Sequence, residues 1–397
     1  MQHSPILFFR LTPISLSIAI AFCFLGSAFA SSSASAKKVH KYIVYVGTYQ
    51  ERGSKGIYAY GFDSKNARLS AMGLQVEASN PAYLRLAPKH HVLYSVNEID
   101  NYQGQQSGAI SAYRTDAKTG ALSLLNQVSS VGAGPCYLSL DKTGKFLLTA
   151  NYGGGSVAAI EVLPDGKLGK ATASVQHHGS SVHPDRQKGP HAHFIETTFD
   201  NRFAIVADLG LDQLLVYKFD SSKGSLIPAA TPFAKLQSGA GPRYFAFHPN
   251  HRYLYLVNEI TSSVTVFSYD AETGTLEEKQ TISTVLQDFK GHSDASEIHM
   301  DASGRFVYVS NRGPDTIAVF RINPTNGTLE MVETVASGGK RPRCFAIAPS
   351  GNFLLAANQD SDNIVTFRID PKSGRLSKVG ATEGVISPVS LAFLEAQ

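Results

Sequence analysis

A turn motif recurs along most of the chain at intervals of about 50 residues. In each copy an apolar run reaches a turn that contains Asp or Asn and, in most copies, Gly, and a Leu then opens the next run. The Asp or Asn side chain bonds to its own backbone, and the Gly supplies the left-handed conformation. The copies lie at Phe62–Leu69, Thr115–Leu122, Leu163–Leu168, Phe219–Leu226, Tyr269–Leu276, Ile322–Leu329 and Ile369–Leu376.

The intervals between the turns share one order of short strand-like runs. The second run of each interval is almost continuously apolar, as in Phe146–Ala150 and Tyr253–Val257. Such runs are typical of strands that are buried on both faces. A repeat of this length, with four strands in each copy, is typical of a β-propeller. We therefore expect an all-β fold of seven blades, each a four-stranded antiparallel sheet.

The two ends of the chain each supply only part of a blade. Residues 41–62 provide a second and a third strand without a first, whereas Val389–Phe393 provides a first strand and nothing more. Pro388 precedes this last strand, as Pro81 and Pro135 precede theirs. The N- and C-terminal strands should therefore form one blade together and close the ring, which removes exposed sheet edges. We expect the propeller to span residues 40–397.

Residues 1–30 have the pattern of a secretory signal peptide. Arg10 is the only charged residue in this stretch, Ile14–Gly26 is apolar, and Ala28–Ala30 has the small residues that a signal peptidase requires. The apolar run is too short to span a membrane as a helix. We expect cleavage after Ala30, a flexible lead-in over residues 31–39, and a periplasmic or secreted protein that has no membrane association after cleavage.

The net charge argues against nucleic-acid binding, and the cysteine content argues against a disulfide. The net charge of +4 is too small to indicate nucleic-acid binding. Cys136 and Cys344 remain after signal cleavage and belong to repeats that are far apart in the sequence. We expect them to be free, half-buried thiols rather than a disulfide. We also expect the protein to be a monomer.

The repeats agree in their scaffold positions but differ in two columns. The first column stands at the start of the first strand and contains Ala82, Cys136, His193, Arg243, Ser296 and Arg343. The second column stands just after the second strand and contains Thr48, Glu98, Tyr152, Leu209, Glu259, Arg312 and Gln359. First strands line the channel of a propeller, so both columns should meet at one end of it. Ionisable residues that converge there predict a ligand pocket.

The segment that leads to His193 is unusually long and polar. It covers His177–Pro190 and could close over the channel as a lid. His191 and His193 alternate along the predicted strand, so both imidazoles should face the same side. We expect His177 and His178 to lie on a solvated part of this segment.

Three stretches carry a family resemblance: Gly239–Glu259, Glu297–His299 and Asn311–Arg312. They resemble the seven-bladed β-propeller lactonases, a family that includes 6-phosphogluconolactonases and the carboxymuconate lactonising enzyme. The resemblance extends over residues 41–397. It implies the propeller fold and an activity on lactones, and it assigns the catalytic His, Arg, Glu and Arg of the family to His193, Arg243, Glu259 and Arg312.

Lactone hydrolysis requires a base that activates water and positive charge that stabilises the tetrahedral oxyanion. Arg243 and Arg312 can bind a carboxylate or phosphate and offset the oxyanion. Two guanidiniums would also hold Glu259 ionised and weaken it as a base. We therefore expect His193 to be the base or acid, with Glu259 orienting it or accepting a substrate hydroxyl. His191 competes with His193 for this role.

Five further residues are expected to contact the substrate: His191, Glu98, Glu297, His299 and Arg343. The spacing of the histidines and Glu297 leaves a metal site undecided. We expect no metal and no other cofactor, and a small anionic or sugar lactone as the substrate.

Three functions remain open at this point. The first is hydrolysis of a sugar lactone, as in 6-phosphogluconolactonases. The second is a carboxymuconate-type lactonising or delactonising reaction on a dicarboxylate. The third is a non-catalytic, exported propeller that binds a ligand. The intact set of Arg and Glu residues in the two columns favours an enzyme. The predicted export leaves the identity of the lactone open, because a phosphogluconolactonase is expected in the cytosol.

Overall fold

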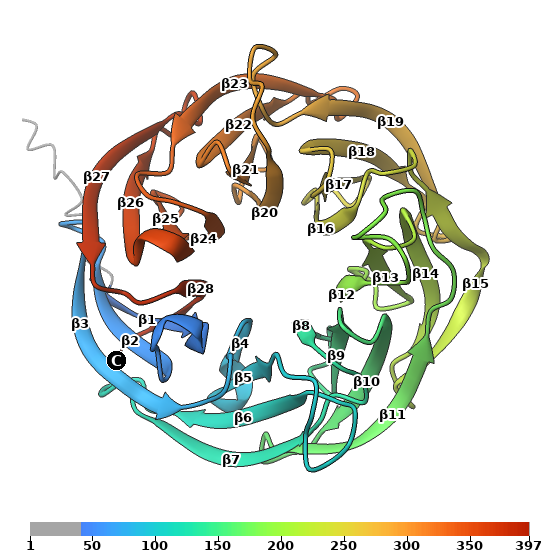
Figure 1. Cartoon of the computed structure of the whole chain (residues 1–397), viewed down its shortest axis with the longest axis horizontal. Helices are drawn as coiled ribbons and strands as arrows, with labels where there is room; N and C mark the ends of the chain where they lie inside the picture. The colour runs from blue at the N-terminus through green and yellow to red at the C-terminus, as the bar shows by residue number, and fades with distance from the viewer. Residues whose placement is uncertain (1–40, 397) are drawn as a thin grey trace, which may run out of the picture. The chain divides into compact units, whose positions relative to one another are not determined.

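Seven sheets, each of four antiparallel strands, stand side by side around a central channel (Figure 1). They are seen in a computed structural model that describes residues 41–396. The predicted all-β, seven-bladed propeller is therefore confirmed. The predicted signal peptide (residues 1–30) and the predicted lead-in (residues 31–39) lie outside the described residues. Within residues 41–396 no helix has the length and apolar character needed to cross a membrane.

The blades are numbered from the N-terminus, and their strands are given from the channel outwards. Blade 1 contains β28 (Pro388–Glu395), β1 (Lys41–Thr48), β2 (Gly56–Asp63) and β3 (Arg68–Glu77). Blades 2 to 4 contain β4 (Leu84–Ala87), β5 (Val92–Asn97), β6 (Ala109–Thr115) and β7 (Leu122–Ser129); β8 (Pro135–Leu140), β9 (Phe146–Asn151), β10 (Ser156–Val162) and β11 (Leu168–Gln176); and β12 (Ala192–Thr197), β13 (Phe203–Asp208), β14 (Gln213–Asp220) and β15 (Ser225–Lys235).

Blades 5 to 7 follow the same order. They contain β16 (Pro242–Phe247), β17 (Tyr253–Asn258), β18 (Ser263–Tyr269) and β19 (Leu276–Ser283); β20 (Asp294–Met300), β21 (Phe306–Arg312), β22 (Thr316–Ile322) and β23 (Leu329–Ala336); and β24 (Pro342–Ile347), β25 (Phe353–Asn358), β26 (Asn363–Ile369) and β27 (Leu376–Glu383). Three short 3-10 helices complete the described elements: η1 (Gln50–Arg52), η2 (Pro88–His90) and η3 (Gln359–Ser361).

The second strands form the core because neighbouring blades cover both of their faces. Every residue of β17 and of β25 is buried, whereas the outer strand β19 is largely exposed. The turn motif also links adjacent blades. Tyr94, Tyr255 and Tyr308 on second strands each donate a hydrogen bond to the turn-glycine carbonyl of the next blade, at 2.8, 2.8 and 3.0 Å. The repeated turn therefore holds neighbouring blades together as well as closing its own hairpin.

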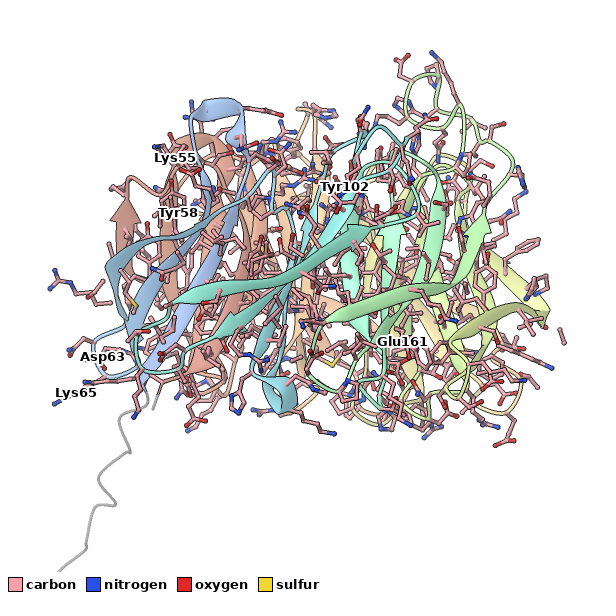
Figure 2. The ribbon with its side chains drawn as sticks, turned by 90° about the horizontal axis from the view of Figure 1, so that it is seen from below. Lys55, Tyr58, Asp63, Lys65, Tyr102 and Glu161 are labelled. Atoms are coloured by element: carbon pink, nitrogen blue, oxygen red, sulfur yellow. The ribbon has the colours of Figure 1, made fainter. Side chains whose placement is uncertain are left out.

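The turn motifs and the loops that follow second strands lie at opposite ends of the ring, as the side view shows for the first blades (Figure 2). Asp63 and Lys65 of the first turn motif lie at one end, and Lys55 and Tyr102, in loops that follow second strands, lie at the other. The second column therefore belongs to the end with Lys55 and Tyr102. The turn chemistry is as predicted: Asp116 accepts hydrogen bonds from the amides of Lys118 and Thr119, at 2.8 and 3.0 Å.

The ring closes through the pairing of the two chain ends, as predicted. Strand β28 pairs with β1 in antiparallel register from Tyr42 opposite Glu395 to Gly47 opposite Ser390. Strand β1 in turn pairs with β2. Within the described residues, blade 1 is thus the blade assembled from both ends of the chain.

The first column is a set of β-bulges. In six blades the innermost strand shifts register near its start, which leaves one or two residues without a partner on the second strand. A bulge turns a side chain away from the regular alternation and is frequent next to active sites. These residues are Cys136, His193, Arg243, Ser296, Glu297, Arg343 and Val389. Because β12 begins at Ala192, the simple alternation expected for His191 and His193 does not apply.

The second column needs one correction, at blade 1. In five of the other blades its amide donates to the carbonyl two residues before the first-column position, as Glu259 does to Gly241 at 2.7 Å. In blade 1 the amide of Tyr49 makes this bond, to Ser387 at 3.2 Å, so Tyr49 and not Thr48 occupies the column. Thr48 is fully buried and donates to the Gly56 carbonyl at 2.6 Å. The sequence register was one residue early because the first strand of this blade comes from the other end of the chain.

Both described cysteines are free thiols, as expected. They are buried rather than half-buried, with 4% of Cys136 and 5% of Cys344 exposed.

Candidate active site

The two columns meet at a cavity of about 510 Å³ at one end of the channel. Second-column residues from six blades line it: Tyr49, Glu98, Tyr152, Glu259, Arg312 and Gln359. First-column residues add Cys136, His193 and Arg343. A larger hollow of about 630 Å³ lies beside Lys55, Glu77 and Gln127, but it does not gather a comparable set of charged side chains. The channel-end cavity is therefore the candidate active site.

Glu259 is the centre of the charged network in this cavity. Its Oε2 atom accepts a hydrogen bond from Arg243 Nε at 2.9 Å and lies 3.0 Å from Arg312 Nη2. Its Oε1 atom accepts from Arg186 Nη2. Burial alone would raise the pKa of Glu259, but Arg312, Arg243 and Arg186 hold it well below its ordinary value. Glu259 is thus a permanent carboxylate that fixes three guanidiniums.

Arg243 lies beneath this network and does not line the cavity. Only 1% of its surface is exposed, its Nη1 donates to the Ser296 carbonyl at 3.0 Å, and its guanidinium lies 4.3 Å from the centre of the Tyr244 ring. All of these contacts are made within the protein. The geometry therefore favours a positioning role for Arg243, through Glu259, over direct contact with a ligand.

His193 lies against the network as a neutral imidazole. Its Nε2 atom is 4.0 Å from Glu259 Oε2, and its Nδ1 atom is 3.6 Å from the Cys136 sulfur. Burial and the neighbouring Arg243 hold the pKa of His193 well below its ordinary value. Burial also raises the pKa of Cys136, so this residue remains a thiol at neutral pH.

His191 lies outside the wall of the cavity. Its ring stacks on Tyr152 with centroids 4.5 Å apart, and its Nδ1 atom is 2.9 Å from the Tyr152 carbonyl oxygen. These contacts hold Tyr152, which does line the cavity. Of the two histidines considered for proton transfer, His193 is the one that reaches the site.

A second group of polar side chains occupies another part of the wall. Arg343 Nη2 donates to the Tyr49 hydroxyl at 2.7 Å, and this hydroxyl donates to Glu98 Oε2 at 2.6 Å. Burial raises the pKa of Glu98 above its ordinary value. The cavity therefore contains two glutamates whose pKa values are shifted in opposite directions.

Arg186 is a cavity residue that the sequence analysis missed. It lies in the β11–β12 connection, the predicted lid, which runs over blade 4 (Figure 1) and brings the Arg186 guanidinium to Glu259 and within 3.3 Å of the Tyr152 hydroxyl. The sequence signal was the insertion itself. A column comparison could not reveal Arg186, because the other repeats have no equivalent segment.

Buried carboxylates anchor this connection. Gln187 is fully buried and donates to Asp212 Oδ1 at 2.7 Å and to the Leu209 carbonyl at 2.8 Å. His177 Nδ1 lies 2.6 Å from Asp208 Oδ2. The expectation that His177 is solvated was wrong: it is 4% exposed, because the Asp208 carboxylate compensates for the burial of its ring.

Glu297 and His299 lie away from this cavity. They line a separate hollow of about 370 Å³, together with Arg85 and Tyr137. Glu297 Oε1 is 3.4 Å from His299 Nε2. Burial raises the pKa of Glu297 to about 7 and lowers the pKa of His299 to about 4. The structure therefore separates these two residues from the other predicted substrate contacts.

The raised pKa of Glu297 predicts a pH-dependent cost to stability. A carboxyl whose folded-state pKa is raised binds its proton more tightly when folded, so the chain should lose stability as pH rises from about 4.5 to about 7. Glu297→Gln cannot ionise. It should be more stable than the parent by about 1–3 kcal/mol at pH 8 and show no such gain at pH 4. Urea unfolding at both pH values measures this, with Glu330→Gln on the outer strand β23 as a control. A gain that is equal at the two pH values would contradict the assignment.

Comparisons with known proteins agree with the fold. The family model described as "Lactonase, 7-bladed beta-propeller" matches residues 43–393. The 6-phosphogluconolactonase of Bacillus subtilis is 38% identical over 310 residues, which cover 78% of this chain and 86% of that protein. The 6-phosphogluconolactonase of Formosa agariphila is 34% identical over 77% of this chain and 86% of its own.

A solved structure is similar over almost the same range. The periplasmic gluconolactonase of Pseudomonas aeruginosa superimposes with a TM-score of 0.84 at 35% sequence identity, covering 90% of this chain and all of that one. The matched family model and the curated relatives each cover well over half of the chain. The chain therefore belongs to the seven-bladed β-propeller lactonase family.

Proposed function

We propose that this chain hydrolyses a sugar lactone in the channel-end cavity, as a 6-phosphogluconolactonase or a closely related gluconolactonase. One observation carries the proposal. A buried carboxylate, Glu259, fixes the guanidiniums of Arg186 and Arg312 beside an open cavity, in a chain that is 38% identical to a 6-phosphogluconolactonase. Fixed positive charge stabilises the oxyanion that forms when water attacks a lactone carbonyl.

The geometry supports a distinct role for each residue. Arg312 and Arg343 line the cavity, so they can bind the substrate and offset the oxyanion. Burial and neighbouring arginines lower the pKa of Arg312 to about 10, which still leaves it a cation at neutral pH. Arg243 and Glu259 position Arg312. His193, whose pKa is low, serves as a hydrogen-bond partner of the substrate rather than as a strong base.

We also propose that the protein is exported and acts as a monomer. The pattern of residues 1–30 supports export, and the related gluconolactonase of Pseudomonas aeruginosa is described as periplasmic. The pairing of β28 with β1 supports a monomer, because it leaves no open blade for a second chain to complete.

A lactone screen tests the proposed reaction. Purified chain beginning at Ser31 is mixed with gluconolactone, 6-phosphogluconolactone and a carboxymuconate-type lactone, and acid release is recorded at pH 7 above the spontaneous rate. We expect turnover of at least one of the two aldonolactones. If no lactone is turned over, the hydrolase proposal is lost and the ligand-binding alternative is favoured. If only the carboxymuconate-type lactone reacts, the second function is favoured.

Arg312→Ala tests the site in the same assay. Loss of a guanidinium that stabilises the oxyanion should lower kcat/KM. The decrease should correspond to about 2–4 kcal/mol of lost transition-state stabilisation. Arg321→Ala, on the exposed side of β22, is the matched control and should keep the parent rate. Equal rates for Arg312→Ala and Arg321→Ala would place the chemistry elsewhere.

A further inference from the structure

Glu98 and Glu259, which both line the cavity, differ in what holds them. Glu259 is bound by three guanidiniums, which keep it ionised and make it a poor proton acceptor. His193 is also a poor acceptor, because burial and Arg243 oppose a positive charge on its ring. A lactone hydrolase nevertheless needs a group that takes a proton from the attacking water. The network around Glu259 does not supply one.

Glu98 has the geometry of such a group. Its backbone is held on both sides by Asn80: the Glu98 amide donates to the Asn80 carbonyl at 3.0 Å, and Asn80 Nδ2 donates to the Glu98 carbonyl at 3.2 Å. Its Oε2 atom accepts a hydrogen bond from the Tyr49 hydroxyl at 2.6 Å. Its Oε1 atom has no protein partner among residues 41–396 and is not enclosed by protein atoms. One oxygen is therefore oriented by the protein and the other faces the cavity.

The surroundings of Glu98 make its carboxylate a stronger base than that of an ordinary glutamate, because they raise its pKa. Burial is the largest influence and raises its pKa, and the charge of Arg343 and the Tyr49 hydrogen bond oppose this only in part. Arg243, Asp100 and Cys136 also face it, and Glu51 and Asp360 line the same cavity. A general base works best when its pKa lies close to the operating pH. A pair of carboxyls in environments that separate their pKa values is a known pattern for dividing such roles.

We propose that Glu98 is the general base that activates the attacking water, with Tyr49 and Arg343 as the residues that position it. The inference rests on the proposed lactone hydrolysis. Glu98 Oε1 takes one proton from the water as its oxygen bonds to the lactone carbonyl carbon, and the carbonyl π electrons move to the oxyanion beside Arg312. The oxyanion then collapses and the ring C–O bond breaks. The ring oxygen receives the proton from Glu98, and the product is the hydroxy acid.

The pH dependence of kcat/KM for Glu98→Gln tests this role, with the best lactone of the parent as substrate. The parent should lose activity as pH falls through the pKa of Glu98, because the base must be ionised. Glu98→Gln should lower kcat by about a hundredfold or more and change KM much less. Its kcat/KM should also lose the decline at low pH, which is the acid limb of the pH profile. Glu98→Asp should keep the limb at a lower kcat. Glu330→Gln, on the outer strand β23, should match the parent.

Tyr49→Phe supplies a readout that a purely structural role would not move. The Tyr49 hydroxyl stabilises the ionised carboxylate, so its removal should raise the pKa of Glu98 and shift the acid limb to higher pH. An acid limb that survives unchanged in Glu98→Gln, while the parent is active, overturns the proposal. Loss of that limb in His193→Gln instead would transfer the role to His193. A parent that hydrolyses no lactone overturns the proposed function itself. Near-ultraviolet circular dichroism confirms that each variant is folded.

Discussion

The single substitution Glu259→Ala should both abolish lactone hydrolysis and destabilise the ring. The substitution leaves Arg243, which is 1% exposed, as a buried charge without its counter-ion. Removing one partner of a buried ion pair typically costs about 3–5 kcal/mol. Arg312 and Arg186 lose their shared anchor at the same time, so kcat/KM should fall by about a thousandfold or more. Unfolding in urea and acid release measure the two effects.

Glu259→Gln separates the charge of this residue from its shape. The amide keeps the volume and one acceptor oxygen but no longer neutralises the guanidiniums. We expect a smaller loss of stability than in the alanine variant and a similar loss of activity. An alanine variant that keeps both the parent rate and the parent stability would show that the cluster of three arginines is not organised by Glu259.

Deleting residues 388–397 should prevent a stable ring. The deletion removes β28, which buries Val389, Leu391 and Ala392 and provides the innermost strand of blade 1. Burial of an aliphatic side chain larger than alanine contributes about 1.5–3 kcal/mol. Together with the lost strand pairing, the total is comparable with the entire stability of a typical domain, about 5–15 kcal/mol. The edge of β1 would also be exposed to aggregation.

Thermal unfolding followed by circular dichroism measures this effect. A chain that ends after Glu395 is the matched control, because it keeps the whole of β28, and it should melt close to the parent temperature. A cooperative transition of the 388–397 deletion at the parent temperature would mean that β28 does not close the ring.

The fold was readable from the sequence because each blade repeats the same local physics. Three sequence patterns each predicted the structure that is observed. They are the turn residues, the continuously apolar second strands and the half-blades at the chain ends. Blade 1 is the exception. Its first strand, Pro388–Glu395, and its second strand, Lys41–Thr48, are far apart in the chain, so comparing neighbours placed Thr48 where Tyr49 lies.

The candidate site was readable only where it follows the repeat. Differences between repeats placed Glu98, His193, Glu259, Arg312 and Arg343 at one cavity. The bulges explain why this worked, since they aim first-column side chains at the same end of the channel. Arg186 could not be found in this way, because its connection has no counterpart in other blades.

Residues within one strand could not be separated by the same comparison. Glu297 and Ser296 both lie in the bulge of β20, yet Glu297 lines the second hollow with Arg85 and His299. Which end of the channel a bulged residue faces depends on packing between blades that are distant in sequence. The role of Arg243 was hidden for a similar reason, since only the structure shows that its guanidinium contacts Glu259, Ser296 and Tyr244.

The most direct test of the central claim is a crystal structure of the parent chain with the hydroxy-acid product of its best lactone. The channel-end cavity has room for one such molecule and contains the guanidiniums of Arg312 and Arg343. We expect the product carboxylate to bond to these two side chains, with Glu98 Oε1 near the carboxyl carbon. Product bound only in the hollow beside Arg85 and His299, or only in the hollow beside Lys55 and Gln127, would contradict the account.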